Sequence, residues 1–327
     1  MTDTWTWATV TQASPLRIKV DGDTYALDAT TDDLVGSLAV DDRVRVHLHA
    51  DGIIVTGIQG GGNRSNPNLL INSNFMVNQR GAVSGASVAH NDYFLDRWEN
   101  VSGIATTAIS WADSGGVRTV TLGGTGVTRI IREVGEAQNF PAGTYTMSWP
   151  GSATGRAYGT SGSGPPFAAS PYTFSVDGTE TVNIDLSGEG DTIDGWVKVE
   201  RGTVATPYQP PTYGDNLRAC ERYFQRLGGV DPYEPIAIGF GASTTRAQPL
   251  IFLPVPLRAL PTVTWGGNFA LRFSTNNKAV SAVALDRAGK SVIRLSVDST
   301  EGLTADAPYE LRTLNDLSAY IAFDAEL

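Results

Sequence analysis

Four kinds of chemistry could in principle be carried by the side chains of this 327-residue sequence: hydrolysis by paired acids, hydrolysis by a serine triad, thiol chemistry and metal binding. The acidic residues mostly stand beside glycine or in turns, as at Asp177-Gly178, and no spacing selects the carboxylate pair of a glycoside hydrolase. A serine hydrolase would need one of only three histidines, and no Gly-x-Ser-x-Gly turn precedes a helix. We therefore expect no catalytic residues, with a hydrolase as the enzymatic alternative.

Metal, thiol and phosphate chemistry are not favoured by the pattern either. His47 and His49 share one face of a predicted strand, but no third ligand stands nearby, so we expect no metal and no cofactor. Cys220 is the only cysteine, which excludes an intrachain disulfide, and its place on the apolar face of a predicted helix indicates a buried, inert thiol. The glycine run at 123–126 is followed by neither Lys-Ser/Thr nor a helix, which excludes a phosphate-binding loop.

The composition narrows the possible partners. The chain has 24 basic and 34 acidic residues, a net charge of −10, and contacts with nucleic-acid phosphates depend on Lys and Arg. Its hydrophobic fraction of 41% is sufficient for packed cores. No apolar run is long enough to cross a membrane, and the first residues lack the basic and apolar segments of a signal peptide. We expect no nucleic-acid partner, no membrane insertion and no export signal.

The sequence predicts an all-β fold, with strands along the whole chain. Any site must therefore be positioned by strands and the loops between them. Short alternating or β-branched runs between Gly, Asp, Asn and Pro are typical of sandwiches and barrels. Clear examples are residues 43–49, 118–122, 143–149, 196–200, 263–265 and 291–297. Only residues 215–227 predict a helix, because apolar positions recur there at 3- and 4-residue steps, with Asp215 as N-cap and Gly228 as the stop. On this helix Arg218, Arg222 and Arg226 would form one basic row.

Residues 1–60 predict a small barrel of the OB type. Five short strands are expected, at 5–11, 16–20, 24–27, 43–49 and 53–58, and Asp51-Gly52 is a hairpin turn between the last two. Such barrels often bind single-stranded nucleic acid, but this one carries four basic residues against nine Asp, a net charge of −5. We therefore interpret it as a docking barrel.

Two breaks in composition predict the domain boundaries. A glycine-rich segment ending at Pro67 indicates a flexible linker at 61–67, and a proline-rich turn at 207–211 precedes the predicted helix. The predicted organisation is a barrel at 1–60, a linker at 61–67, a central module at 68–211, and a helix with a C-terminal module at 212–327.

A series of motifs beyond residue 68 resembles a module series of bacteriophage tail fibres and minor tail proteins. The motifs are NLLINSNF at 68–75, NQRG at 78–81, DRW at 96–98, GTYTMSW at 143–149, WVKVERG at 196–202, ATPY at 205–208, RACERYF at 218–224, PVPLRALPTVT at 254–264 and AFDAEL at 322–327. They follow one another in the family's order over about residues 68–327. The N-terminal barrel is also similar to the leading module of minor tail proteins from phages of GC-rich, Gram-positive hosts.

This resemblance implies a jelly-roll sandwich like that of carbohydrate-binding modules for the central module, and a β-sandwich tip for the C-terminal module. It implies a virion protein, made in the host cytoplasm, that attaches the tail to a host surface polysaccharide without catalysis. Other tail or baseplate proteins and copies of the chain itself, most often as a homotrimer, would be the protein partners. The alternatives are a purely structural tail or baseplate component, a glycan depolymerase, and a free adhesin of cellular origin.

Glycan binding would require aromatic faces for sugar C–H surfaces and polar groups for hydroxyls. The aromatic candidates are Trp98, Trp111, Tyr158, Tyr172, Tyr233, Trp265 and Phe269, although most aromatic side chains fill cores and the motif around Trp98 favours a structural role for it. Tyr158 stands in the Gly- and Ser-rich stretch 151–166, which predicts a mobile surface loop. Asp96, Arg97 and Trp98 of the DRW motif predict a structural unit, an Asp–Arg ion pair packed on an aromatic plane.

Overall fold

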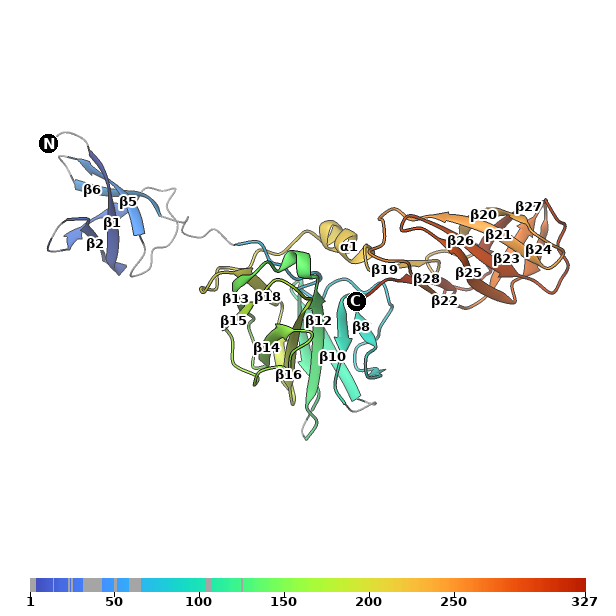
Figure 1. The fold of residues 1–327 in the computed structure, drawn as a ribbon, viewed down its shortest axis with the longest axis horizontal. Coiled ribbons are helices and arrows are strands. Elements are labelled where there is room, and N and C mark those ends of the chain that lie inside the picture. Colours follow the sequence, from blue (N-terminus) through green and yellow to red (C-terminus); the bar gives the residue numbers. More distant parts are fainter. Residues whose placement is uncertain are drawn as a thin grey trace. The chain divides into compact units, whose positions relative to one another are not determined.

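The computed structural model describes residues 4–13, 15–22, 24, 26–31, 43–49, 52–58, 66–103, 107–124 and 126–327. These residues form an almost purely β protein with a single α-helix, which confirms the all-β prediction (Figure 1). The chain divides into two compact units, Met1–Pro67 with Val204–Gln209, and Asn68–Thr203 with Pro210–Leu327. The predicted boundary between residues 211 and 212 stays a prediction, although separate hydrophobic cores form in the parts of the second unit before and after the helix.

The N-terminal unit, for which the strand pattern predicts a five-stranded barrel of the OB type, forms one sheet of six short strands in its described residues. Its strands are β1 (Thr4–Ala13), β2 (Leu16–Val20), β3 (Leu27–Asp28), β4 (Thr30–Thr31), β5 (Arg43–His49) and β6 (Gly52–Ile58). They form one sheet in the order β3-β2-β1-β5-β6-β4, in which only the β4–β6 pair is parallel. Ala8, Val10, Ile18, Val44 and Val46 are fully buried in its core. Asp51 of the predicted hairpin turn and residues 61–65 of the predicted linker lie outside the described residues.

The central module, for which the resemblance implies a jelly roll, is a sandwich-like unit of three antiparallel sheets around one core. Its strands are β7 (Ser87–Val88), β8 (Tyr93–Leu95), β9 (Trp98–Asn100), β10 (Thr107–Ser114), β11 (Val117–Leu122), β12 (Arg129–Gly135), β13 (Gly143–Ser148), β14 (Thr154–Gly159), β15 (Tyr172–Val176), β16 (Val182–Gly188), β17 (Asp191–Asp194) and β18 (Lys198–Arg201). The sheets have the orders β14-β16-β12-β9-β8, β17-β11-β10-β7 and β15-β13-β18. Side chains from all three meet in the core, for example Ile184, Val120 and Met147.

The predicted mobile loop at 151–166 is wrong in its first half, because residues 154–159 form strand β14. This strand pairs with β16 along its whole length. The small residues of this strand suggested a loop, but at Gly155 the packing requires a small residue. A Cβ on Gly155 would lie 2.5 Å from the indole of Trp149. Glycine therefore lets the strand pass directly over a buried tryptophan.

The predicted helix is shorter than expected. Helix α1 spans Tyr213–Glu221, and Thr212 rather than Asp215 caps it by accepting a hydrogen bond from the Asp215 N–H. Residues Phe224–Leu227 form strand β19 instead, because they pair with strand β28 (Tyr320–Asp324), which sequence spacing cannot reveal. The basic row therefore does not exist: Arg222 forms an ion pair with Glu136 at 3.3 Å, and Arg226 lies in β19 with its guanidinium over Tyr320.

The C-terminal module is a β-sandwich of a seven-stranded and a three-stranded sheet. Its remaining strands are β20 (Pro235–Gly241), β21 (Arg246–Phe252), β22 (Thr262–Gly266), β23 (Phe269–Phe273), β24 (Asn276–Ala279), β25 (Ala282–Ala288), β26 (Val292–Asp298) and β27 (Pro308–Thr313). The sheet orders are β24-β23-β27-β20-β21-β26-β25 and β19-β28-β22. Leu271, Leu295 and Phe323 lie fully buried between the two sheets.

Replacing Gly155 by alanine is expected to destabilise the chain by about 1–3 kcal/mol, because the rigid indole of Trp149 must move to admit the new methyl group. Gly214→Ala is the matched control, since nothing lies within 4 Å of a Cβ there and alanine favours a helix. Urea unfolding measures both variants. Equal stability of G155A and wild type would contradict the packing described.

Candidate functional site

A row of polar side chains crosses the outer face of the five-stranded sheet in the central module. The strand register places Glu99 opposite Arg132, Arg132 opposite Asp185, and Asp185 opposite Arg156. Tyr158 lies two residues beyond Arg156 on the same face of β14. We call Glu99, Arg132, Asp185, Arg156 and Tyr158 the polar strip.

Asp185 holds the polar strip together. Its carboxylate accepts hydrogen bonds from Arg132 Nε (2.6 Å) and Nη2 (3.1 Å), and from Arg156 Nε (2.9 Å). The Tyr158 hydroxyl donates to the same carboxylate at 3.2 Å and accepts from Arg132 Nη2 at 2.8 Å. Asp185 is fully buried, whereas each arginine side chain is 20% exposed. The arrangement therefore fixes two planar donor groups at the surface.

Aromatic rings flank these guanidinium groups. Arg156 Cζ lies 4.3 Å from the ring centre of Phe167 and 5.1 Å from that of Tyr158. Within the described part of the chain, Arg132 Nη1 and Arg156 Nη2 make no hydrogen bond, so both can donate to a ligand. Fixed N–H donors beside half-buried aromatic rings suit the hydroxyls and C–H faces of a sugar.

Glu99 lies at one end of the polar strip, and its carboxyl group has a raised pKa. Burial raises the pKa of Glu99 above its usual value, and the neighbouring Arg132 partly opposes this shift. The surroundings of Glu99 therefore disfavour the charged form of its carboxyl group.

Of the aromatic residues proposed from the sequence, only Tyr158 joins this site. Trp111 and Tyr172 are half-buried against the core of the central module, and Trp265 packs against the C-terminal core. Phe269 is buried, so it cannot contact a ligand. Tyr233 is 46% exposed with Arg312 over its ring at 4.8 Å, but it stands in the C-terminal module.

Sequence reasoning missed Arg132, Arg156, Asp185 and Phe167. A single signal points to them: charged residues interrupt strands that are otherwise apolar or small, as Asp185 does within 182–188. A charge at the centre of a strand requires a partner across the sheet. The partner itself depends on the strand order, which spacing along the chain does not give.

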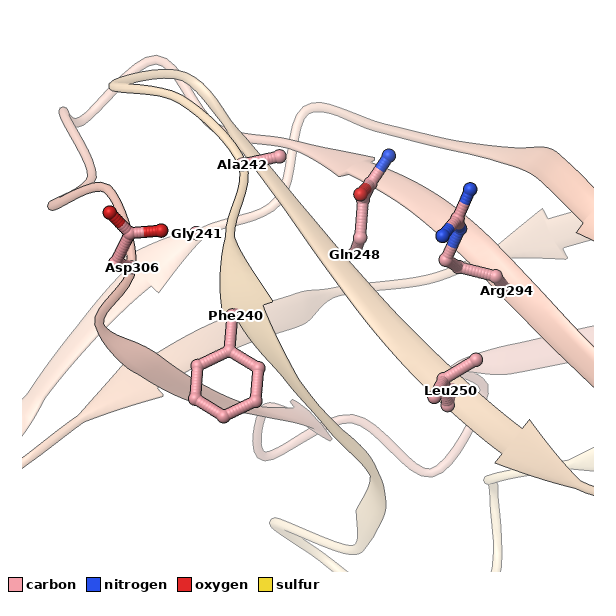
Figure 2. Close-up of a pocket in the computed structure, with 7 residues that line it drawn as sticks. All are labelled: Phe240, Gly241, Ala242, Gln248, Leu250, Arg294 and Asp306. Carbon is pink, nitrogen blue, oxygen red and sulfur yellow. The ribbon is translucent and has the colours of Figure 1, made fainter.

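A second surface feature is a pair of hollows on the outer face of the seven-stranded sheet. The first has a volume of about 330 Å³ and is lined by Phe240, Gln248, Leu250, Arg294 and Asp306 among others (Figure 2). The second, of about 320 Å³, shares Leu250 and Arg294 with it. Both are shallow and open on an apolar surface.

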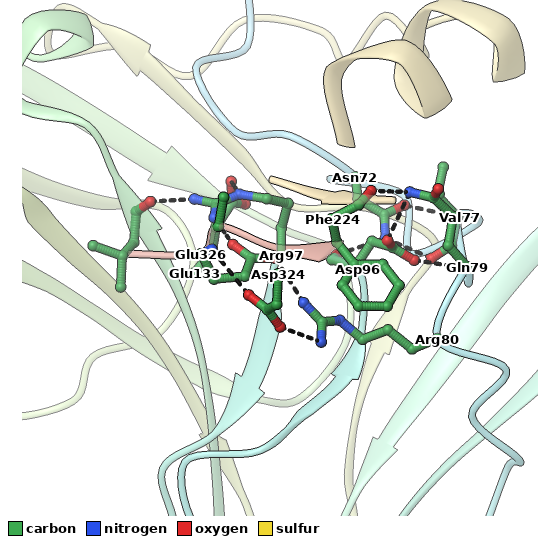
Figure 3. A network of polar contacts seen from close by, with 12 residues as sticks. Asn72, Val77, Gln79, Arg80, Asp96, Arg97, Glu133, Phe224, Asp324 and Glu326 are labelled. Atoms are coloured by element: carbon green, nitrogen blue, oxygen red, sulfur yellow. Dashed lines mark hydrogen bonds and ion pairs between the residues drawn. The ribbon is translucent and has the colours of Figure 1, made fainter. Parts of the chain in front are cut away.

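The DRW motif belongs neither to the polar strip nor to the hollows. It is part of a buried polar network that joins the central module to β28 (Figure 3). Arg97 is almost fully buried and forms ion pairs with Glu326 and, at 3.7 Å, with Glu133. Its guanidinium lies 3.7 Å from the ring centre of Tyr223. The predicted Asp96–Arg97 pair on Trp98 is therefore wrong, because Arg97, at a φ of +71°, reaches other acids and another ring.

Asp96 and Trp98 have separate roles in this network. Asp96 accepts hydrogen bonds from the Gln79 N–H (2.6 Å) and its side-chain amide (3.0 Å). Trp98 is fully buried, and its Nε1–H donates to the Asn72 carbonyl at 3.0 Å. A structural role for the DRW residues fits all three positions.

Arg80 connects the NQRG motif to the same place. It forms ion pairs with Asp324 (3.0 Å) and Glu326 (3.1 Å), and its guanidinium lies 4.0 Å from the ring centre of Phe224. Residues of five motifs that resemble the tail-protein family thus meet in one junction: Asn72, Gln79, Arg80, Asp96, Arg97, Tyr223, Phe224, Asp324 and Glu326. Their shared purpose in this chain is to hold two sandwiches together.

Burial changes the acidity of several groups in the network. It raises the pKa of Glu133 to about 8 and that of Asp96 to about 6, with Arg97 and the Gln79 N–H respectively opposing these shifts. It also raises the pKa of the Cys220 thiol, which is buried as predicted and therefore unreactive. A protonated Glu133 leaves Arg97 and Glu326 as the balanced charge pair.

No protein-family model matches this chain, and a search of curated proteins finds no match. Within the described ranges, no group of three or more His, Cys, Asp or Glu side chains is placed to hold a metal ion. Among the same residues, no helix has the length and apolar character needed to cross a membrane.

The stability of the chain is expected to fall as the pH rises from about 5 to 8. The pKa of Glu133 is higher in the folded chain than its ordinary value, so folding favours the protonated form and loses that advantage as the proton leaves. The loss attributable to this residue is of the order of 3 kcal/mol. Urea midpoints measured across this range should decline in wild type and decline less in Glu133→Gln.

Asp113→Asn is the control for this pH series. Asp113 is half exposed, and its hydrogen bond with Arg118 lowers its pKa, so its charge does not change above pH 5. Identical slopes in wild type and E133Q would contradict the buried state of Glu133.

Glu326→Ala is expected to cost about 3–5 kcal/mol, because it leaves the buried Arg97 without its closest counter-charge. Leu327→Ala, at an exposed neighbour, should cost less than about 1 kcal/mol. The double variant R97M/E326M should regain part of the loss, since it removes both charges. Thermal unfolding measures all three, and full stability of E326A alone would refute the role given to the pair.

Proposed function

We propose that this chain is a bacteriophage minor tail or tail-fibre protein that attaches the virion to a surface polysaccharide of the host without cleaving it. The observation that carries this proposal is the polar strip, in which the fully buried Asp185 orients Arg132 and Arg156 beside Tyr158. Two partly exposed guanidinium groups and adjacent aromatic rings form a site suited to neutral or acidic sugars.

The chemistry of the polar strip supports binding rather than hydrolysis. A glycosidase needs two carboxyl groups that can attack, or transfer a proton, at the scissile bond. Both Asp185 oxygens accept hydrogen bonds from arginine, and the side chain is fully buried, so it cannot do either. Glu99 would then be a lone acid, which is insufficient for this mechanism. A glycan depolymerase is accordingly the weaker alternative.

The tail assignment rests on the ordered motifs and on what they do in this chain. Their residues form the junction between two sandwiches, which is a reason for such a motif set to occur together. In this proposal the OB-like barrel docks to other tail or baseplate proteins. Copies of the chain, as a homotrimer, multiply individually weak sugar contacts into firm attachment.

A purely structural tail or baseplate component is the second candidate. It is favoured by one observation: within the polar strip the charges of Asp185, Arg132 and Arg156 already compensate one another. Such a row could serve only to stabilise the sheet. Binding measurements separate this candidate from the first.

Arg156→Gln is expected to weaken binding of the full chain to host cell-wall polysaccharide about tenfold, because a charged donor of the polar strip is lost. Arg118→Gln is the matched control, since Arg118 also pairs with an aspartate and lies 5.5 Å from the ring centre of Trp111, but on another sheet. Pulldown with purified polysaccharide measures binding, and a reducing-sugar assay should detect no cleavage.

The outcomes distinguish the candidates. Wild-type protein that binds no host polysaccharide supports the structural component, and released reducing sugar supports the depolymerase. Equal binding by R156Q, R118Q and wild type would show that the polar strip is not the glycan-binding site. Unfolding curves for each variant show whether lost binding reflects lost structure.

A further inference from the structure

The outer face of the seven-stranded sheet carries large apolar side chains where a solvent-facing sheet surface is normally polar. The exposed fractions are 69% for Ile238, 62% for Phe240, 42% for Leu250, 73% for Phe252 and 39% for Val292. The register makes them neighbours, with Ile238 opposite Leu250 and Phe252 opposite Val292. We call these five residues the apolar face.

The apolar face is not an extension of the core. Alternate residues of the same strands, such as Ala247, Ile251 and Leu295, already fill the interior on the other side of the sheet. Both sides of these strands are therefore apolar, as in a sheet that is covered on both faces. A contiguous exposed patch of this kind marks an interaction surface.

The sheet is large enough for a stable contact between proteins. Seven strands about 4.8 Å apart, each about six residues long, present roughly 700 Å² on one face. A standard interface buries about 800 Å² on each partner. The apolar face with its polar surroundings therefore matches one side of such an interface.

The edges of this sheet are protected against added strands. Edge strand β24 is only four residues long and carries Lys278, and edge strand β25 has a bulge at Leu285/Arg287 beside exposed charges. Short, charged and bulged edges resist pairing with another chain. A partner is therefore expected to pack on the face rather than extend the sheet.

The charges around the apolar face are nearly balanced, so they do not oppose another copy of this chain. Five arginines and four acids lie on this side of the sheet or at its hollow, a local charge of +1: Arg246, Arg272, Arg287, Arg294, Arg312, Asp286, Asp298, Asp306 and Glu310. Two of the acids are already paired, in Arg246–Asp298 and Arg294–Asp286. The whole chain has a charge of −10, so this surface repels a second copy less than an average surface does.

We propose that the apolar face is a self-association surface, which packs against the same face of the other copies of this chain in the oligomer. Phe240 and Phe252 are the central contacts, and the hollows beside Leu250 receive side chains of the other copy. The proposal rests on the self-assembly contained in the proposed function. It does not depend on glycan binding, because the polar strip lies on another sheet.

The test compares the mass of the full chain with that of F240E/F252E by light scattering during gel filtration, up to about 100 µM protein. Wild type should form an oligomer, and the double variant should associate at least about 100-fold more weakly, because two charges would be buried in the contact. Leu260→Glu is the matched control, since Leu260 is 66% exposed but lies outside the apolar face. Ile238→Lys provides an independent second variant.

A monomeric wild type would overturn the proposal, as would a double variant with the mass of wild type. A double variant that stays oligomeric but no longer binds host polysaccharide would identify the face as a sugar platform and also overturn it. A monomeric double variant whose individual chains still bind polysaccharide would support self-association at this face. An oligomer that binds no glycan would refute the proposed function alone.

Discussion

The buried guanidinium of Arg97 is the constraint on which the architecture of the second unit depends. Arginine keeps its proton at any physiological pH, so a buried arginine must be neutralised by acids brought to it. Glu133 comes from the central module and Glu326 follows strand β28 of the C-terminal module. The ion pair between Arg97 and Glu326 therefore holds the two sandwiches in contact, and Tyr223 adds an aromatic face to the same guanidinium group.

The location of this constraint changes what the sequence motifs mean. Residues such as Arg80, Asp96 and Arg97 resemble those of a tail-protein family, yet in this chain they are buried or half-buried in a junction. The groups that could touch a sugar, Arg132, Arg156 and Tyr158, stand outside those motifs. The sequence motifs therefore locate the junction, whereas the candidate site follows from the strand register.

Local pattern predicted much of the fold, and long-range pairing limited the rest. Strands Leu16–Val20 and Arg43–His49 were predicted to the residue, because alternation and turn residues fix them locally. Residues 224–227 were assigned to a helix because their spacing suits either element, and only β28, about 100 residues away, decides between them. The polar strip was missed for the same reason: Asp185 and its two arginines become neighbours only through the strand order.

The distance along the chain between Arg97 and Glu326, 229 residues, has a consequence for biosynthesis. The central sandwich leaves the ribosome long before the acid that completes its junction has been translated. Until then the nascent module carries an incompletely neutralised cation at its surface, and contacts between distant residues form slowly. The junction can therefore form only after both sandwiches have been synthesised.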